Sequence, residues 1–163
     1  MIAEIGHFAL ILALVLSVVQ CVLPLVGAAR GIGSWMALAR TAAYANALFL
    51  TISFGTLAYS FYISDFTLLN VASNSNSLLP WFYKVAATWG SHEGSILFWA
   101  LMLTWWGFLV ALTSRKLPQE TVARVLGVMG FITAGFVAFM LFTSNPFLRL
   151  FPAAPEGADL NPL

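Results

Sequence analysis

The sequence predicts an all-α integral membrane protein with four transmembrane helices. The chain has 163 residues, of which 61% are hydrophobic and only 8% are charged, and its mean hydropathy is +0.91. A soluble domain carries about 25% charged residues, so this chain has too few to cover a surface in water. Its apolar residues also gather into long runs, which differ from the short alternating segments of a soluble core.

Four of these runs contain no Asp, Glu, Lys or Arg. We expect a transmembrane helix over each of them, at residues 7–27, 41–63, 95–113 and 125–143. Roughly 20 helical residues span the hydrocarbon core, and lipid leaves the backbone no hydrogen-bond partner outside the helix. The first run follows the acidic Glu4 and is longer than the apolar part of a signal peptide, so we interpret it as a retained span.

The basic residues indicate how these helices are oriented. Five of the 7 Lys and Arg residues lie in the connections after the first and third runs: Arg30, Arg40, Arg115, Lys116 and Arg124. The loop 64–94 and the tail 144–163 hold only Lys84 and Arg149. Because Lys and Arg favour the cytoplasmic side, we expect this loop, this tail and both termini in the periplasm, beyond a bacterial inner membrane.

Polar residues inside the runs are few and uncharged. Gln20 and Asn46 are expected to form hydrogen bonds between helices, although contact with a ligand is an alternative. Proton pumps and ion-coupled transporters need ionisable groups at membrane depth, and the runs contain no acid, Lys or Arg. The pattern therefore argues against a transporter that works by itself.

Small residues in the fourth run predict a helix-packing face, because they allow another backbone to approach closely. They are Gly127, Gly130, Ala134 and Ala138. Cys21 is the only cysteine and is expected to be a packing residue, since a single cysteine forms no internal disulfide and no C-x-x-C dithiol.

The loop 64–94 contains the segment that is most unusual for a membrane insert. After a Ser/Asn cluster at residues 73–77, Pro80 suits a first helical turn. On such a helix Trp81, Val85 and Trp89 share one face with Phe82, and Lys84 is expected to reach water. The segment is thus predicted as an amphipathic interfacial helix in contact with membrane lipid, or alternatively as an aromatic belt anchor.

The element that follows joins this segment to the third run. Ser91 is expected to cap the helix and Glu93 to lie in its first turn, where the helix dipole favours an acid. This explanation leaves His92 and the flanking Trp89 and Trp99 without a role.

The sequence alone leaves two interpretations of His92 open. His92-Glu93 is no zinc motif, because residue 96 is Ile, and zinc needs at least three protein ligands, so we expect no metal site. His92 is either an axial haem ligand or proton-sensitive contact, or a structural histidine of the interface. His7, at the start of the first run, is a weaker candidate.

At these residues the chain resembles the CcmF/NrfE/CcsA family of haem-handling cytochrome c biogenesis proteins. The most specific motif is Trp-Gly-Ser-His-Glu-Gly-Ser at residues 89–95 with Trp99, together with Ser-Asn-Ser-Asn at 73–76. Further matching segments are residues 4–6, 79–80, 87–88, 122–126, 142–147 and 156–163.

The resemblance implies a role in cytochrome c maturation. It implies a haem lyase subunit that receives b-type haem from the chaperone CcmE and joins its vinyl groups to an apocytochrome c presented by CcmH. The motif positions Trp89, Gly90, His92, Glu93, Gly94 and Trp99 are the candidate haem-contacting surface. The resemblance also implies that the family's haem-ligating histidines lie beyond the end of this sequence. The catalytic residues stay unassigned, and no nucleic-acid partner is expected.

The resemblance also implies that the sequence is a piece of a longer protein. Family members are several times longer, and this sequence stops within a shared motif at residues 159–163. We therefore expect an N-terminal fragment or a split-gene product that is inactive alone and is completed by the remaining sequence. The alternatives are a non-catalytic membrane scaffold for the assembly complex, a haem transporter fragment, and an NrfE role in place of a CcmF role.

Overall fold

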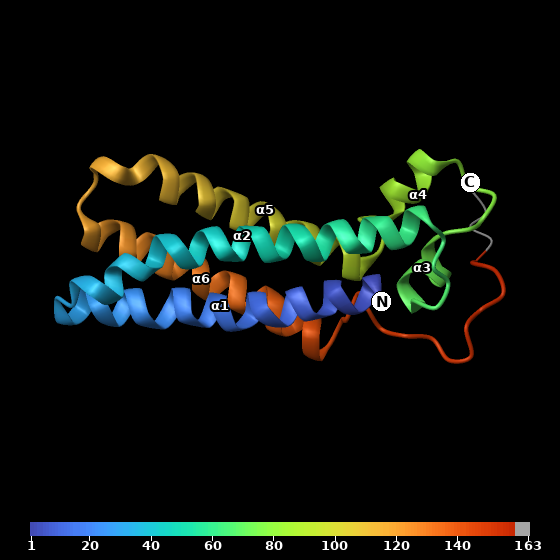
Figure 1. Cartoon of the computed structure of the whole chain (residues 1–163), viewed down its shortest axis with the longest axis horizontal. Helices are drawn as coiled ribbons and strands as arrows, with labels where there is room; N and C mark the ends of the chain where they lie inside the picture. Colours follow the sequence, from blue (N-terminus) through green and yellow to red (C-terminus); the bar gives the residue numbers. More distant parts are fainter. Residues whose placement is uncertain (159–163) are drawn as a thin grey trace.

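The computed structural model describes residues 1–158 and consists of helices joined by turns and loops (Figure 1). Four long helices lie side by side: α1 (Ile2–Arg30), α2 (Gly33–Tyr62), α5 (His92–Thr113) and α6 (Gln119–Phe142). All four are long and apolar enough to cross a membrane. The predicted fold class is therefore confirmed.

The two ends of this bundle differ. One end, called the basic end below, carries the turn between α1 and α2 and the 3-10 helix η1 (Ser114–Lys116). The other end, called the loop end, carries the chain segment between α2 and α5 and the tail after α6. Two short helices lie at the loop end, α3 (Leu69–Asn74), which the sequence did not predict, and α4 (Trp81–Ala87).

The long helices extend beyond the charge-free runs. The first begins at Ile2 and the second at Gly33, because the ends of a spanning helix leave the hydrocarbon core and tolerate polar residues there. The third begins at His92 instead of residue 95, because Ser91 caps it. The loop expected at 64–94 therefore ends three residues earlier than predicted.

The centre of the bundle holds the two amides. The side-chain amides of Asn46 on α2 and Gln20 on α1 are in contact at 2.7 Å, and Gln20 donates to the carbonyl oxygen of Leu126 on α6 at 2.9 Å. Both side chains are buried. The predicted hydrogen bonding between helices is confirmed, and it links three of the four spans.

Glycines of α6 make this close packing possible. A Cβ on Gly130 would lie 3.0 Å from the backbone nitrogen of Cys21 and from the Gln20 side chain, and one on Gly127 would lie 2.7 Å from Leu25. The predicted packing face is thus confirmed at the two glycines. Further along α6 the buried line continues through Thr133 and Val137, so Ala134 and Ala138 are only half-buried.

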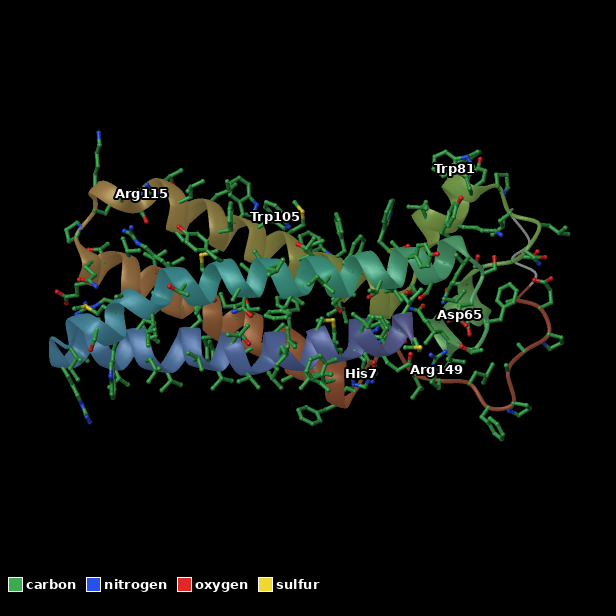
Figure 2. All side chains as sticks on the ribbon, in the orientation of Figure 1. His7, Asp65, Trp81, Trp105, Arg115 and Arg149 are labelled. Carbon is green, nitrogen blue, oxygen red and sulfur yellow. The ribbon has the colours of Figure 1, made fainter. Side chains whose placement is uncertain are left out.

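The α4 region corrects two details of the sequence prediction. Lys84 is half-buried and donates to the Ser64 hydroxyl at 2.7 Å, because α4 packs against the end of α2 and brings the two residues together. Trp89 lies beyond the end of α4 and packs on Phe98 of α5, with 6.1 Å between the ring centroids, so it does not share the α4 face. Trp81 remains 65% exposed (Figure 2).

The tail folds back over the loop end. The Leu69 amide donates to the Leu148 carbonyl at 2.9 Å, and the Leu150 amide donates to the Thr67 carbonyl at 2.8 Å. Arg149 bonds to Glu4 and lies 3.7 Å from a carboxylate oxygen of Asp65 (Figure 2). These contacts join the start of α1, the loop and the tail into one unit.

A second contact holds the tail further along. The hydroxyl of Ser77 donates to the Glu156 carboxylate at 2.6 Å and its backbone amide does so at 2.9 Å. These bonds, with that from the Gly157 amide, favour the charged form and lower the pKa of Glu156. The Glu156 carboxyl is therefore charged at neutral pH. The motif positions 159–163 lie outside the described residues.

We predict that Gly130→Leu destabilises the bundle by about 1–3 kcal/mol, the usual cost of overpacking a tight contact. Gly135→Leu in the same helix is the matched control, because a Cβ there has no neighbour within 4 Å. Thermal unfolding of both variants in one detergent measures the difference. Equal stabilities for the two variants would contradict the close approach of α1 and α6.

Candidate functional site

The residues that the sequence singled out lie at the loop end, where α5 begins. Ser91 caps this helix, accepting a hydrogen bond from the Gly94 amide at 3.0 Å, and Glu93 lies in the first turn. The Ser95 hydroxyl donates to the Trp89 carbonyl at 2.7 Å and closes the turn from the other side. The predicted N-cap is therefore confirmed.

The two glycines of the motif have different surroundings. Gly94 is buried, and a Cβ on it would lie 2.8 Å from the carbonyl carbon of Thr88 and 3.0 Å from the Ser91 hydroxyl. Gly90 is exposed, and a Cβ there would only touch Ala87 at 3.4 Å. The backbone that approaches Gly94 thus belongs to this chain, which gives Gly94 a role in shaping the turn.

The two tryptophans of the motif, Trp89 and Trp99, also have different surroundings. Trp89 packs on Phe98, whose ring in turn lies 5.7 Å from Phe54 of α2, so Trp89 anchors the turn to the bundle. Trp99 is 66% exposed. It lies seven residues after His92, which is close to two helical turns, so the two residues share one face of α5.

His92 joins the beginning of α5 to the end of α6. Its Nδ1 lies 3.1 Å from the Ser144 hydroxyl, and its ring meets Phe139 edge-on at 6.2 Å. The residue is exposed, and its other ring nitrogen, Nε2, makes no hydrogen bond within residues 1–158. Sequence reasoning missed the contact with Ser144, because the two residues lie far apart in the chain.

An apolar groove begins at His92 and runs between α5 and α6. Its volume is about 490 Å³. The lining residues are His92, Ile96, Ile132, Gly135, Phe136 and Phe139. Because Gly135 has no side chain, the groove is open at its centre.

On the other side of the α5 N-terminus lies a smaller, polar pocket of about 210 Å³. Glu93 lines it together with Asn70 and Asn74 of α3 and with Ser144 and Asn145 after α6. The side-chain nitrogen of Asn70 is buried and makes no hydrogen bond. His92 and Glu93 are adjacent in the chain but line different cavities: His92 lines the apolar groove and Glu93 lines the polar pocket.

His7 is not part of either cavity lining. Its ring is stacked on Phe147 at 6.3 Å between centroids, in the contact between α1 and the tail. Among residues 1–158, no three side chains of the His, Cys, Asp and Glu types are grouped so as to hold a metal ion. His92 is therefore the histidine that lies beside an open cavity in this part of the chain.

Comparison with known proteins gives this geometry a context. No family model matches the chain. The cytochrome c-type biogenesis protein CcmF of Pseudomonas aeruginosa is 57% identical over 164 residues, which cover 100% of this chain and 25% of that protein. The CcmF of Escherichia coli is 49% identical over the same share. The chain is homologous to the N-terminal quarter of CcmF proteins.

A solved structure agrees with the sequence match. The cytochrome c haem lyase CcmF has a TM-score of 0.83 and 27% identity to this chain, covering 90% of it and 25% of that structure. NrfE of Haemophilus influenzae is 45% identical over the whole chain. The resemblance to this family is thus confirmed, and the chain spans about a quarter of the length of the relatives it matches.

We predict that Gly94→Ala destabilises the protein by about 1–3 kcal/mol, because the added Cβ would overlap the Thr88 carbonyl. Gly90→Ala is the matched control and should be near neutral, since its backbone has negative φ and its surroundings are open. Thermal unfolding of both variants tests this. A destabilised Gly90→Ala beside an unaffected Gly94→Ala would overturn the assignment.

Proposed function

We propose that this chain is the N-terminal membrane region of a cytochrome c haem lyase subunit and that its His92 groove contacts haem. The observation that carries the proposal is the hydrogen bond between His92 Nδ1 and the Ser144 hydroxyl at the mouth of an apolar groove. A histidine that ligates a metal commonly uses one ring nitrogen for the metal and the other for an orienting hydrogen bond. The relatives that match the whole chain are cytochrome c biogenesis proteins.

The groove suits a flat apolar ligand such as a b-type haem. Phe136, Phe139 and Ile96 would supply aromatic and aliphatic contact to such a ligand, and the His92 imidazole would supply a nitrogen that can bind its iron. Trp99, on the same face of α5, extends this surface. The haem itself supplies the vinyl groups that react, so the part of this chain is to bind and orient it.

The remaining motif residues support the groove indirectly. Ser91, Gly94 and Trp89 fix the first turn of α5, which sets the position of His92. Glu93 points instead to the polar pocket beside α3. We therefore assign haem contact to His92 and Trp99, and assign to Trp89 and Gly94 the shape of the turn.

The proposed setting is the bacterial inner membrane, with the loop end in the periplasm. Five of the basic residues lie toward the basic end: Arg30, Arg40, Arg115, Lys116 and Arg124. Figure 2 shows Arg115 at this end and His7 and Arg149 at the opposite, loop end. The proposed partners are membrane lipid, the haem chaperone CcmE, CcmH with apocytochrome c, and the remaining sequence of the same protein. In this setting haem reaches the groove from the periplasmic side.

A membrane scaffold is the second candidate. The exposed aromatic side chains of α4, with Trp81 65% and Tyr83 57% exposed, offer a surface for a partner or for lipid at the loop end. A scaffold would bind its partners equally well without haem. Haem dependence of co-purification with CcmE therefore distinguishes the two functions.

We predict that His92→Ala and Gly135→Leu, placed in the full-length protein, each reduce cytochrome c maturation roughly tenfold, as loss of an orienting contact does at a metal site. His92→Ala removes the ring nitrogen, and Gly135→Leu fills the groove. Covalent haem in a c-type cytochrome is measured alongside immunodetection of the variant. Gly55→Leu is the matched control, because Gly55 also faces open space but lies on α2, away from the groove.

Normal maturation in both variants at normal protein level would contradict the haem-contact proposal. A loss that only follows reduced protein level would do the same, because it would show a role in folding alone. Loss with unchanged haem-independent partner binding would support haem contact.

For topology, we predict that a reporter active only in the periplasm is active when fused after Ala153 and silent when fused at Ser114. The reason is the excess of Arg and Lys at the basic end. The two fusions serve as controls for each other, with immunodetection of both. The reverse pattern of activity would place the loop end in the cytoplasm and end the proposal of a periplasmic site.

A further inference from the structure

A third cavity lies at the basic end, far from the His92 groove in the fold. It has a volume of about 300 Å³ and lies where α2, η1 and α6 meet. Arg40 of α2, Arg115 of η1 and Gln119 of α6 are its polar lining residues. Met36, Leu117 and Val122 form apolar walls.

The lining of this cavity contains two arginines and no acidic residue. The Arg40 guanidinium donates to the carbonyl oxygen of Ser114 at 2.9 Å, which holds its charge at the cavity. Within residues 1–158, neither Arg40 nor Arg115 forms a salt bridge. Glu120, the nearby acid, pairs with Arg124. Two guanidinium groups therefore face the cavity without a carboxylate to neutralise them.

The local backbone keeps these groups together. Gln119 donates to the carbonyl oxygen of Gly33 at 3.0 Å and so ties the first residue of α6 to the start of α2. The bond from Arg40 to Ser114 ties α2 to η1 in the same way. The cavity is thus a site built by three elements, in which polar contacts between the elements set the position of the arginines.

The position of the cavity along the helices places it at headgroup depth. The 24 residues of α6 rise about 36 Å, which exceeds the roughly 30 Å of the hydrocarbon core. Gln119 is the first residue of α6, and the charged Glu120 and Arg124 follow it within two turns, so this is the end of the helix that extends beyond the hydrocarbon. At that depth the abundant anion is the phosphate of the lipids themselves.

We propose that this cavity binds the phosphate of an anionic phospholipid headgroup. Guanidinium groups match phosphate oxygens in geometry and form charge-assisted hydrogen bonds with them. Basic pockets between transmembrane helices commonly take such headgroups. The apolar walls suit the glycerol and the first acyl carbons, which free phosphate lacks. A bound lipid would bridge α2 to the turn between α5 and α6.

The test counts lipids bound to the full-length protein by native mass spectrometry, with added phosphatidylglycerol or phosphatidylcholine. We expect preferential binding of phosphatidylglycerol, weakened about fivefold in Arg115→Gln, since one basic residue near an anionic surface contributes about 1 kcal/mol. Arg115 is exposed and its side chain makes no hydrogen bond within residues 1–158, so this variant should fold normally. Lys116→Gln is the matched control, because it removes the same charge from a neighbouring residue that does not line the cavity.

The possible outcomes distinguish a lipid headgroup from free phosphate as the bound group. Selective binding that falls in Arg115→Gln and persists in Lys116→Gln supports the proposal. Equal binding of both lipids, or an equal loss in the two variants, would overturn it, because the second result indicates diffuse charge attraction. Displacement of the lipid by inorganic phosphate alone would also overturn it, since the site would then prefer a free anion.

Discussion

Lipid offers no hydrogen-bond partner to a polar side chain, and Gln20 and Asn46 meet this constraint by bonding to each other and to the backbone of α6. The contact depends on Gly130, which lets Gln20 lie against the α6 backbone. A polar pair in the middle of the spans thus determines which faces of α1, α2 and α6 meet. The hydrophobic contacts around this pair add stability, but they depend less on direction and so determine the orientation of the helices less.

The positions of the His92 groove and of the cavity at the basic end follow from this packing. With α2 and α6 fixed, α5 packs against both, and its N-terminus is held by the turn from Thr88 to Gly94. His92 therefore reaches Ser144 at the end of α6. At the opposite end the same register brings Arg40 to Ser114. One bundle geometry thus produces an apolar groove with a histidine at one end and a cationic cavity at the other.

The sequence predicted those features that depend on local or repeated chemistry. Charge-free runs indicated the spans, Ser91 indicated the cap, and Gln20 with Asn46 indicated hydrogen bonds between helices. The contacts of His92 with Ser144 and of Arg149 with Glu4 join residues far apart in the chain, so no spacing rule shows them. The same reason applies to Lys84, which bonds to Ser64 only because α4 packs on α2.

The most direct test of this account is a double-mutant cycle on Gln20 and Asn46. The free energy of unfolding is measured in one detergent for the wild type, Gln20→Met, Asn46→Leu and the double variant. The account predicts a favourable coupling of about 1 kcal/mol, as expected for a hydrogen bond between transmembrane helices. Strictly additive effects would contradict it, because they would mean that the two amides do not act as the pair that organises the bundle.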